Sequence, residues 1–190
     1  MDTRDFLKWL RLEAALDFAT KAHEGQVRKY TGEPYICHPI AVARLVVSVV
    51  ARTAVSVADG RNMIIAAILH DTVEDTDVTL DEIERLFGVD VASLVESLTN
   101  VSTLQDGLRR MRKEVDRLHT AKASPRAKTI KLADLIDNSR SIIERDPKFA
   151  KVYIGEKKLL LEVLAEGDPA LFSEAQRIVF EAHEKLGMCY

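Results

Sequence analysis

Three helix-start signals constrain the fold of this 190-residue chain more than any other feature of its sequence. They are the pairs Ser124-Pro125, Asp146-Pro147 and Asp168-Pro169. Ser and Asp side chains accept backbone N–H bonds at helix N-termini, and proline suits the first helical position, where no hydrogen-bond donor is needed. Each pair therefore predicts the start of a helix. The expected helices cover residues 125–144, 147–165 and 169–186.

The rest of the chain follows the same helical pattern. Apolar residues recur at helical spacing over residues 3–24, and no segment alternates with the period of two that is typical of a strand. Thr79 and Glu82 have the spacing of a capping box, and Gly88 suits a helix end, so a short helix is expected between them. Further helices are expected over residues 39–51, 60–73, 90–99 and 103–121. The sequence predicts an all-α fold: one compact domain, residues 1–190, of about eight or nine helices.

The composition is that of a globular protein, and it favours a cytoplasmic location. Hydrophobic residues make up 47% of the chain and charged residues 30%, and the net charge of −3 gives no overall attraction for nucleic acid or an anionic membrane. The two cysteines form no C-x-x-C pair, and the longest apolar run contains Arg44 and is too short to span a bilayer. We expect a cytoplasmic protein whose partners include neither nucleic acid nor membrane.

The stretch "AILHDTVEDT", residues 67–76, places ionisable groups directly after a buried helix. Burying His70 and Asp71 is costly unless something replaces their lost hydration, and a divalent metal ion does so through strong ligand bonds. If the helix continues, His70 lies over Glu74 and Asp71 over Asp75. The segment thus predicts a metal site, although a solvated helix end is the alternative interpretation.

Two further ligands are available elsewhere in the chain. His38 stands immediately before a helix in "YICHPI", and Asp134 interrupts the apolar helix "TIKLADLIDNSR", where it forms an i, i+4 pair with Asn138. Two imidazoles and two carboxylates suit a first-row divalent ion such as Mn, Fe or Zn better than calcium. The residue types alone leave two alternatives open. His38 could be a cap or a core histidine, and Asp134 could pair with a basic side chain, Lys131 or Arg140.

Three sequence blocks resemble those of a known family. The blocks "HEGQVRKYTGEPYICHPIAVA", "AAILHDTVEDTDVTLDEI" and "KTIKLADLIDNSR" are similar in order and spacing to the RelA/SpoT-type guanosine-3′,5′-bispyrophosphate hydrolases of the HD-domain superfamily. The resemblance implies an HD-domain fold and hydrolysis of the 3′-pyrophosphate of ppGpp or pppGpp, by a metal-activated water, to GDP or GTP plus pyrophosphate. Because the chain ends near the end of the hydrolase domain, it resembles the stand-alone small alarmone hydrolases.

The resemblance also assigns roles to residues at matching positions. The implied metal ligands, usually for one Mn²⁺, are His38, His70, Asp71 and Asp134. The implied catalytic residues, which position or activate the attacking water, are Glu74 and Asp75. The implied contacts to the small-molecule nucleotide are Arg28, Lys29, Arg109 and Asn138.

Some departures and alternatives remain at this stage. Leu135 and Asp137 replace an Arg and a His that are common in the family, and the loop before His38 is one residue longer than in many members. The alternative functions are an HD phosphohydrolase for an adenosine alarmone of the ppApp type, NADPH or a dNTP, a non-catalytic nucleotide sensor, and a helical interaction module. The sequence leaves open the oligomeric state, the base preference and any regulation.

Overall fold

The three cap-and-proline pairs begin helices as predicted. The computed structural model describes the backbone of residues 3–188 and the side chains of residues 11–188. The side chains of Ser124, Asp146 and Asp168 each accept backbone N–H bonds from the first helical turn. The helices that they open are α8 (Pro125–Arg145), α9 (Pro147–Leu161) and α10 (Pro169–Lys185).

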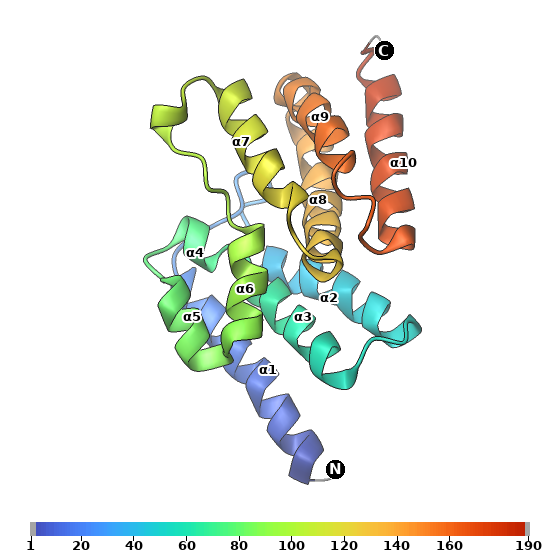
Figure 1. The fold of residues 1–190 in the computed structure, drawn as a ribbon. Coiled ribbons are helices and arrows are strands. Elements are labelled where there is room, and N and C mark those ends of the chain that lie inside the picture. The colour runs from blue at the N-terminus through green and yellow to red at the C-terminus, as the bar shows by residue number, and fades with distance from the viewer. Residues whose placement is uncertain (1–2, 189–190) are drawn as a thin grey trace. The chain divides into compact units, whose positions relative to one another are not determined.

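The all-α prediction is confirmed for the described residues (Figure 1). The other elements, in chain order, are α1 (Thr3–Ala22), α2 (Cys37–Arg52), α3 (Val57–Leu69), α4 (Thr72–Asp75), α5 (Leu80–Phe87), α6 (Val89–Leu98), the 3₁₀-helix η1 (Leu104–Asp106) and α7 (Arg109–Ala121). No strand forms within residues 3–188, where an isolated antiparallel bridge joins Val27 to Pro34.

The helix expected over residues 60–73 has different bounds. It begins earlier, at Val57, because the Ser56 side chain accepts the backbone N–H of Asp59. It ends at Leu69, whose carbonyl accepts a hydrogen bond from the Thr72 hydroxyl at 2.7 Å. The break turns the backbone at His70 and Asp71 before the single turn of α4 begins.

The helix expected over residues 103–121 is divided in two. Gly107 follows η1 with φ 88°, a left-handed backbone conformation that side chains other than glycine rarely adopt. The helix α7 resumes at Arg109, so the predicted helix was wrong across residues 107–108. The short helix between Thr79 and Gly88 is confirmed, because Thr79 accepts the N–H of Glu82 and Gly88 caps the C-terminus.

The chain folds into two compact units. The first comprises Met1–Arg28 and Glu33–Thr99, and its core forms around α3, which packs against α1, α2 and α6. Ile65 and Leu69 of α3 are fully buried, and burial of such a side chain contributes about 1.5–3 kcal/mol. The apolar body of α3 thereby fixes the position of His70, which directly follows it.

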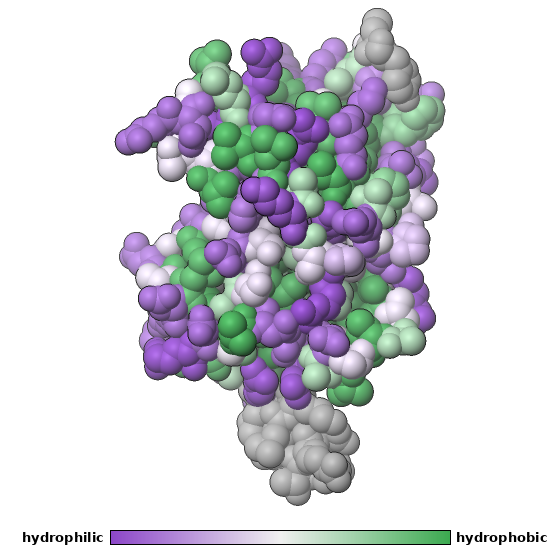
Figure 2. Space-filling model, in the orientation of Figure 1, coloured by the Kyte–Doolittle hydropathy of each residue, from purple (hydrophilic) through white to green (hydrophobic). Residues whose placement is uncertain are grey.

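The second unit comprises Lys29–Gly32 and Asn100–Tyr190. In this unit α8 packs against α9 and α10, with Leu132 and Ile136 fully buried. Exposed apolar side chains also occur, including Met111 and Leu118 on α7, and Figure 2 shows hydrophobic surface over this helix. Because Leu132 and Ile136 face the core of this unit, the packing of α8 fixes the orientation of the helix and therefore the position of Asp134.

Within the described residues, no helix is both long enough and apolar enough to cross a membrane.

Candidate metal centre

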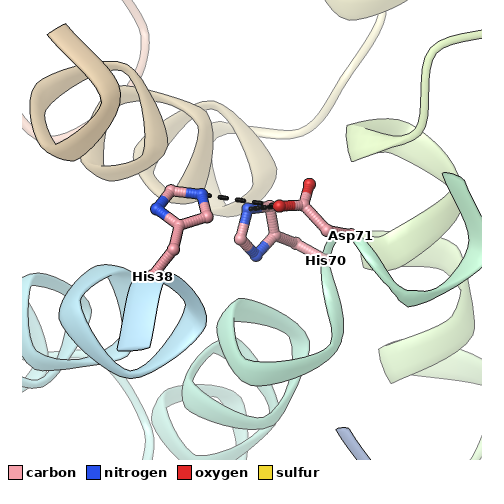
Figure 3. A group of neighbouring side chains, drawn as sticks. All are labelled: His38, His70 and Asp71. Carbon is pink, nitrogen blue, oxygen red and sulfur yellow. Dashed lines mark ion pairs between the residues drawn. The ribbon is translucent and has the colours of Figure 1, made fainter. Parts of the chain in front are cut away.

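Three of the four predicted metal ligands lie together in the first unit. His38 comes from the first turn of α2, and His70 and Asp71 from the break after α3 (Figure 3). One ligand atom from each residue lies within 4.8 Å of the others. Nε2 of His38 is 3.4 Å, and Nε2 of His70 3.1 Å, from the same oxygen, Oδ2 of Asp71. Both imidazoles are about 1% exposed.

The local backbone explains why His70 presents the correct ring nitrogen. Its Nδ1 lies 2.9 Å from the carbonyl oxygen of Ala67, one turn earlier. A carbonyl only accepts hydrogen bonds, so Nδ1 carries a proton, and in the neutral ring Nε2 then presents its lone pair toward Asp71. A ligating histidine is commonly oriented by such a bond on its other nitrogen.

The donor set fits a divalent cation. A lone pair on His70 Nε2 and a carboxylate oxygen 3.1 Å away repel each other, and a cation held between them removes that repulsion. Two imidazole nitrogens and a carboxylate, all on buried or half-buried side chains, are ligands that first-row divalent metals accept. His38, His70 and Asp71 therefore form a candidate metal centre.

Asp71 and Asp75 share a hydrogen-bond donor that the sequence analysis missed. The Tyr35 hydroxyl lies 2.7 Å from Oδ2 of Asp71 and 3.0 Å from Oδ2 of Asp75. Burial and the two carboxylates raise the pKa of Tyr35 above its usual value, so the hydroxyl keeps its proton. Tyr35 stands three residues before His38 in "YICH". This one-turn separation could have indicated that Tyr35 lies close to the metal ligand His38.

Asp75 has the electrostatic environment of a base. Partial desolvation by the surrounding protein atoms, followed by the negative charge of Asp71, raises the pKa of the Asp75 carboxyl. Its backbone N–H donates to the Asp71 carbonyl at 2.9 Å, so the predicted i, i+4 relation survives the helix break. The side chains of Asp75 and of Glu74, the other predicted catalytic residue, are both exposed to solvent.

Asp134 and Asn138 form the predicted pair in the second unit. Asn138 Nδ2 donates to Oδ1 of Asp134 at 2.6 Å, and Lys131 Nζ lies 3.3 Å from Oδ2. The role of Asp134 as a fourth metal ligand stays a prediction. Lys157 has a perturbed pKa that sequence reasoning did not foresee: burial lowers it to about 8, although Asp134 acts in the opposite direction.

Two predicted substrate-binding cations of the second unit meet at one aromatic ring. Lys29 Nζ lies 5.8 Å from the ring centre of Phe149, and the Arg109 guanidinium carbon lies 5.3 Å from it. Arg109 also makes two hydrogen bonds to Glu156, of 2.7 and 2.9 Å, which raise its pKa further and keep it cationic. Sequence reasoning missed Phe149, whose position in a helix carries no distinctive signal.

Arg28, the remaining predicted substrate residue, belongs to the loop of the first unit. Its backbone N–H donates to the Glu33 carbonyl at 2.8 Å, beside the Val27–Pro34 bridge. This closed loop holds Arg28 half-buried. Its contact with substrate stays a prediction.

Comparisons with known proteins are consistent across sequence and structure. The family described as HD domain matches residues 15–161. Human guanosine-3′,5′-bis(diphosphate) 3′-pyrophosphohydrolase MESH1 is 46% identical over 138 residues, 72% of this chain and 72% of its own. The Aquifex aeolicus guanosine-3′,5′-bis(diphosphate) 3′-pyrophosphohydrolase is 38% identical over 145 residues, 74% of this chain but 19% of that longer protein.

A solved structure agrees with these sequence relatives. It is described as a metazoan orthologue of SpoT that hydrolyses ppGpp, and it matches with a TM-score of 0.77 and 30% identity. The match covers 94% of this chain and 97% of that one. The family match includes His38, His70 and Asp71, the three clustered side chains.

Proposed function

The chain belongs to the HD-domain family, and from that premise we propose that it hydrolyses the 3′-pyrophosphate of guanosine 3′,5′-bispyrophosphate. The products are GDP, or GTP from pppGpp, and pyrophosphate. The observation that carries the proposal is the convergence of His38, His70 and Asp71, with the Asp75 carboxyl tied to Asp71 through Tyr35. The names of the human and Aquifex relatives and the matching structure support the substrate.

The metal in this proposal is one Mn²⁺ ion. His38, His70 and Asp71 would hold the ion, with Asp134 proposed as a fourth ligand, and Fe or Zn would suit the same donor set. When bound, such an ion supplies Lewis-acid chemistry and lowers the pKa of a coordinated water.

The general base is Asp75, assisted by Glu74. A base works best when its pKa is near the operating pH, and the raised pKa of Asp75 moves it in that direction. Asp75 takes a proton from the attacking water as the water oxygen bonds to the phosphorus next to the ribose 3′-oxygen. The bond between that phosphorus and the 3′-oxygen breaks, pyrophosphate leaves, and the 3′-oxygen takes a proton from solvent, so no covalent enzyme intermediate forms. Positioned proton transfer of this kind contributes about 10²–10⁴-fold to the rate.

The nucleotide phosphates bind to the basic side chains. Lys29 and Arg109, which meet at Phe149, present two positive charges from segments distant in sequence. Arg28 adds a third charge, and Asn138 offers an amide beside Asp134 for the ribose or the scissile phosphate. Guanidinium groups bind phosphate oxygens in pairs, which favours Arg for this role.

The proposal treats residues 1–190 as one phosphohydrolase domain that acts on a free nucleotide in the cytoplasm. The family match over residues 15–161 includes segments of both compact units, which supports a single functional domain.

Product analysis tests this function. Purified protein is incubated with ppGpp and Mn²⁺, and we expect GDP and pyrophosphate in equal amounts by anion-exchange chromatography. Chelation and the variant Asp71→Asn should abolish turnover, whereas Glu84→Gln, an equal loss of charge at an exposed position on α5, should preserve it. Parallel reactions with ppApp, NADPH and dNTPs measure base and substrate preference. Faster turnover of any of these than of ppGpp would contradict the proposal.

A further inference from the structure

The Tyr35 hydroxyl stands between the two carboxylates on which the proposed chemistry depends. It is 2.7 Å from Asp71, a proposed metal ligand, and 3.0 Å from Asp75, the proposed base, and it meets the Oδ2 atom of each. A hydroxyl has one proton to donate, whereas ionised carboxylates only accept. The two negative carboxylates repel each other, and this shared donor offsets part of that repulsion.

The Tyr35 ring is held in place by contacts that do not involve its hydroxyl. Ring centroids lie 4.7 Å apart for Tyr35 and His23 and 5.9 Å apart for Tyr35 and His38. The Tyr35 backbone N–H donates to the Gln26 carbonyl at 3.0 Å, and the His38 N–H donates to the Tyr35 carbonyl at 2.9 Å. Removing only the hydroxyl should therefore leave the ring, and the adjacent ligand His38, where they are.

Asp75 is also held from its backbone side. Gln26 Nε2 donates to the Asp75 carbonyl at 2.9 Å, which satisfies an acceptor at the end of the one-turn helix α4. The Gln26 side-chain oxygen lies in turn 2.8 Å from Nδ1 of the buried His23. With its backbone fixed in this way, Asp75 retains mainly side-chain rotation, and the Tyr35 hydroxyl restricts that rotation.

We propose that Tyr35 is a positioning residue, whose hydroxyl sets the separation and orientation of the Asp71 and Asp75 carboxylates. The inference rests on the proposed function, because it takes its meaning from a metal at Asp71 and a base at Asp75. Tyr35 has two separable effects: it orients the carboxylate that binds the ion, and it aims the carboxylate that takes the proton. Outer groups that orient metal ligands typically matter by about 10–100-fold in metal affinity or activity.

The variant Tyr35→Phe tests both effects while it preserves the ring packing. At saturating Mn²⁺ we expect kcat to fall about 10–100-fold, with a much smaller change in KM, because Tyr35 acts through Asp75 and not through substrate. Calorimetric titration without nucleotide should show Mn²⁺ affinity weakened by about tenfold or more. The control Ser97→Ala removes an exposed hydroxyl on α6 that donates only within its own helix, and it should change neither quantity.

A double-mutant cycle separates positioning from a general loss of structure. In the Asp75→Asn background, Tyr35→Phe should reduce kcat much less than it does in the wild type, because residues that act as a unit are not additive. If the reduction is equally large in both backgrounds, or if Tyr35→Phe alone leaves kcat within twofold of wild type, the proposal is overturned.

The metal titration remains informative if the proposed function fails. Should the wild-type protein hydrolyse none of the nucleotides, Mn²⁺ affinity still compares Tyr35→Phe with the wild type. Weaker Mn²⁺ binding by Tyr35→Phe would support the proposal that the Tyr35 hydroxyl orients the Asp71 carboxylate, and equal binding would refute it.

Discussion

Asp116 on α7 secures the segment that leads from α6 to Arg109. Its carboxylate, 6% exposed, accepts the backbone N–H groups of Val101 at 3.2 Å and Ser102 at 2.9 Å through one oxygen. The other oxygen accepts the Ser102 hydroxyl at 3.0 Å and Lys113 Nζ at 3.2 Å. We predict that this carboxylate is a main source of stability for the segment. Two substitutions, Asp116→Ala and Asp116→Asn, separate the contribution of the backbone N–H bonds from that of the side-chain bonds.

The size of the effect follows from the bonds that each substitution removes. Asp116→Ala leaves two backbone donors without their acceptor, so the free energy of unfolding should fall by about 2–4 kcal/mol. Asp116→Asn keeps an oxygen for both backbone donors but places an amide NH₂ opposite Ser102 and Lys113, so it should cost about 1–2 kcal/mol. For a chain of this size each kcal/mol lowers Tm by about 2–4 °C.

The same carboxylate predicts a dependence on pH. Burial alone would raise the pKa of Asp116, but the hydrogen bonds from Ser102 and the charge of Lys113 outweigh burial and lower it. Because the folded pKa is below the unfolded value of about 3.9, the stabilisation is present above that pH and is lost as the pH falls through the folded pKa. The difference in Tm between wild type and Asp116→Asn should therefore be largest near neutral pH and should shrink below about pH 4.

Thermal unfolding followed by circular dichroism checks both the size and the pH dependence. The control is Glu114→Gln, which breaks an exposed ion pair with Arg117 on the same helix and should cost no more than about 1 kcal/mol. Equal Tm values for Asp116→Ala and Glu114→Gln, or a wild-type advantage over Asp116→Asn that persists unchanged in acid, would refute the reasoning.

Three further predictions concern packing and substrate binding. Gly60→Ala should destabilise the protein by about 1–3 kcal/mol in urea unfolding, because a Cβ there would lie 2.6 Å from a Val50 methyl group; no loss would contradict this packing. Gly155→Ala, inside α9 with no atom within 4 Å of the new Cβ, should instead stabilise by about 0.5–1 kcal/mol, and a loss would show hidden crowding. Under the proposed function, in which Arg109 binds a substrate phosphate, Arg109→Gln should raise KM for ppGpp by roughly tenfold or more with kcat little changed. Glu156→Gln, which releases Arg109 from its ion pair, should not raise KM, and an unchanged KM in Arg109→Gln would contradict the phosphate contact.

Local sequence signals predicted the starts of α8, α9 and α10, where the signal and the structure involve neighbouring residues. The start of α3 was expected three residues too late although its Ser56 cap is equally local, and α9 ends at Leu161 and not at residue 165. Ser124, Asp146 and Asp168 accept bonds from residues two or three positions ahead, so short sequence windows contain the whole interaction. The other errors came where a helix pattern continued through a break. The period of apolar residues gave no sign of the backbone turn at His70, and Gly107 resembled an ordinary glycine inside a helix.

In the candidate site, too, contacts between residues close in sequence were predictable, and contacts between distant residues were missed. His70, Asp71 and Asp75 are close in sequence, so their proximity was predictable from helical spacing. His38 was a candidate ligand from its residue type and its place before a helix, and the family resemblance implied the same role. Tyr35 was missed because it meets Asp71 and Asp75 across 36 and 40 residues of chain. Phe149 was missed for the same reason, since Lys29 and Arg109 reach it from distant segments.

The sequence by itself determined the fold class, most helix starts and the chemical types available for a metal centre, because capping, helical period and ligand chemistry are local properties. Only the tertiary structure decided that His38 faces Asp71 at 3.4 Å and that one tyrosine hydroxyl joins two carboxylates. Those distances depend on how buried helix faces pack, and packing is a sum of many weak contacts between residues far apart in the chain.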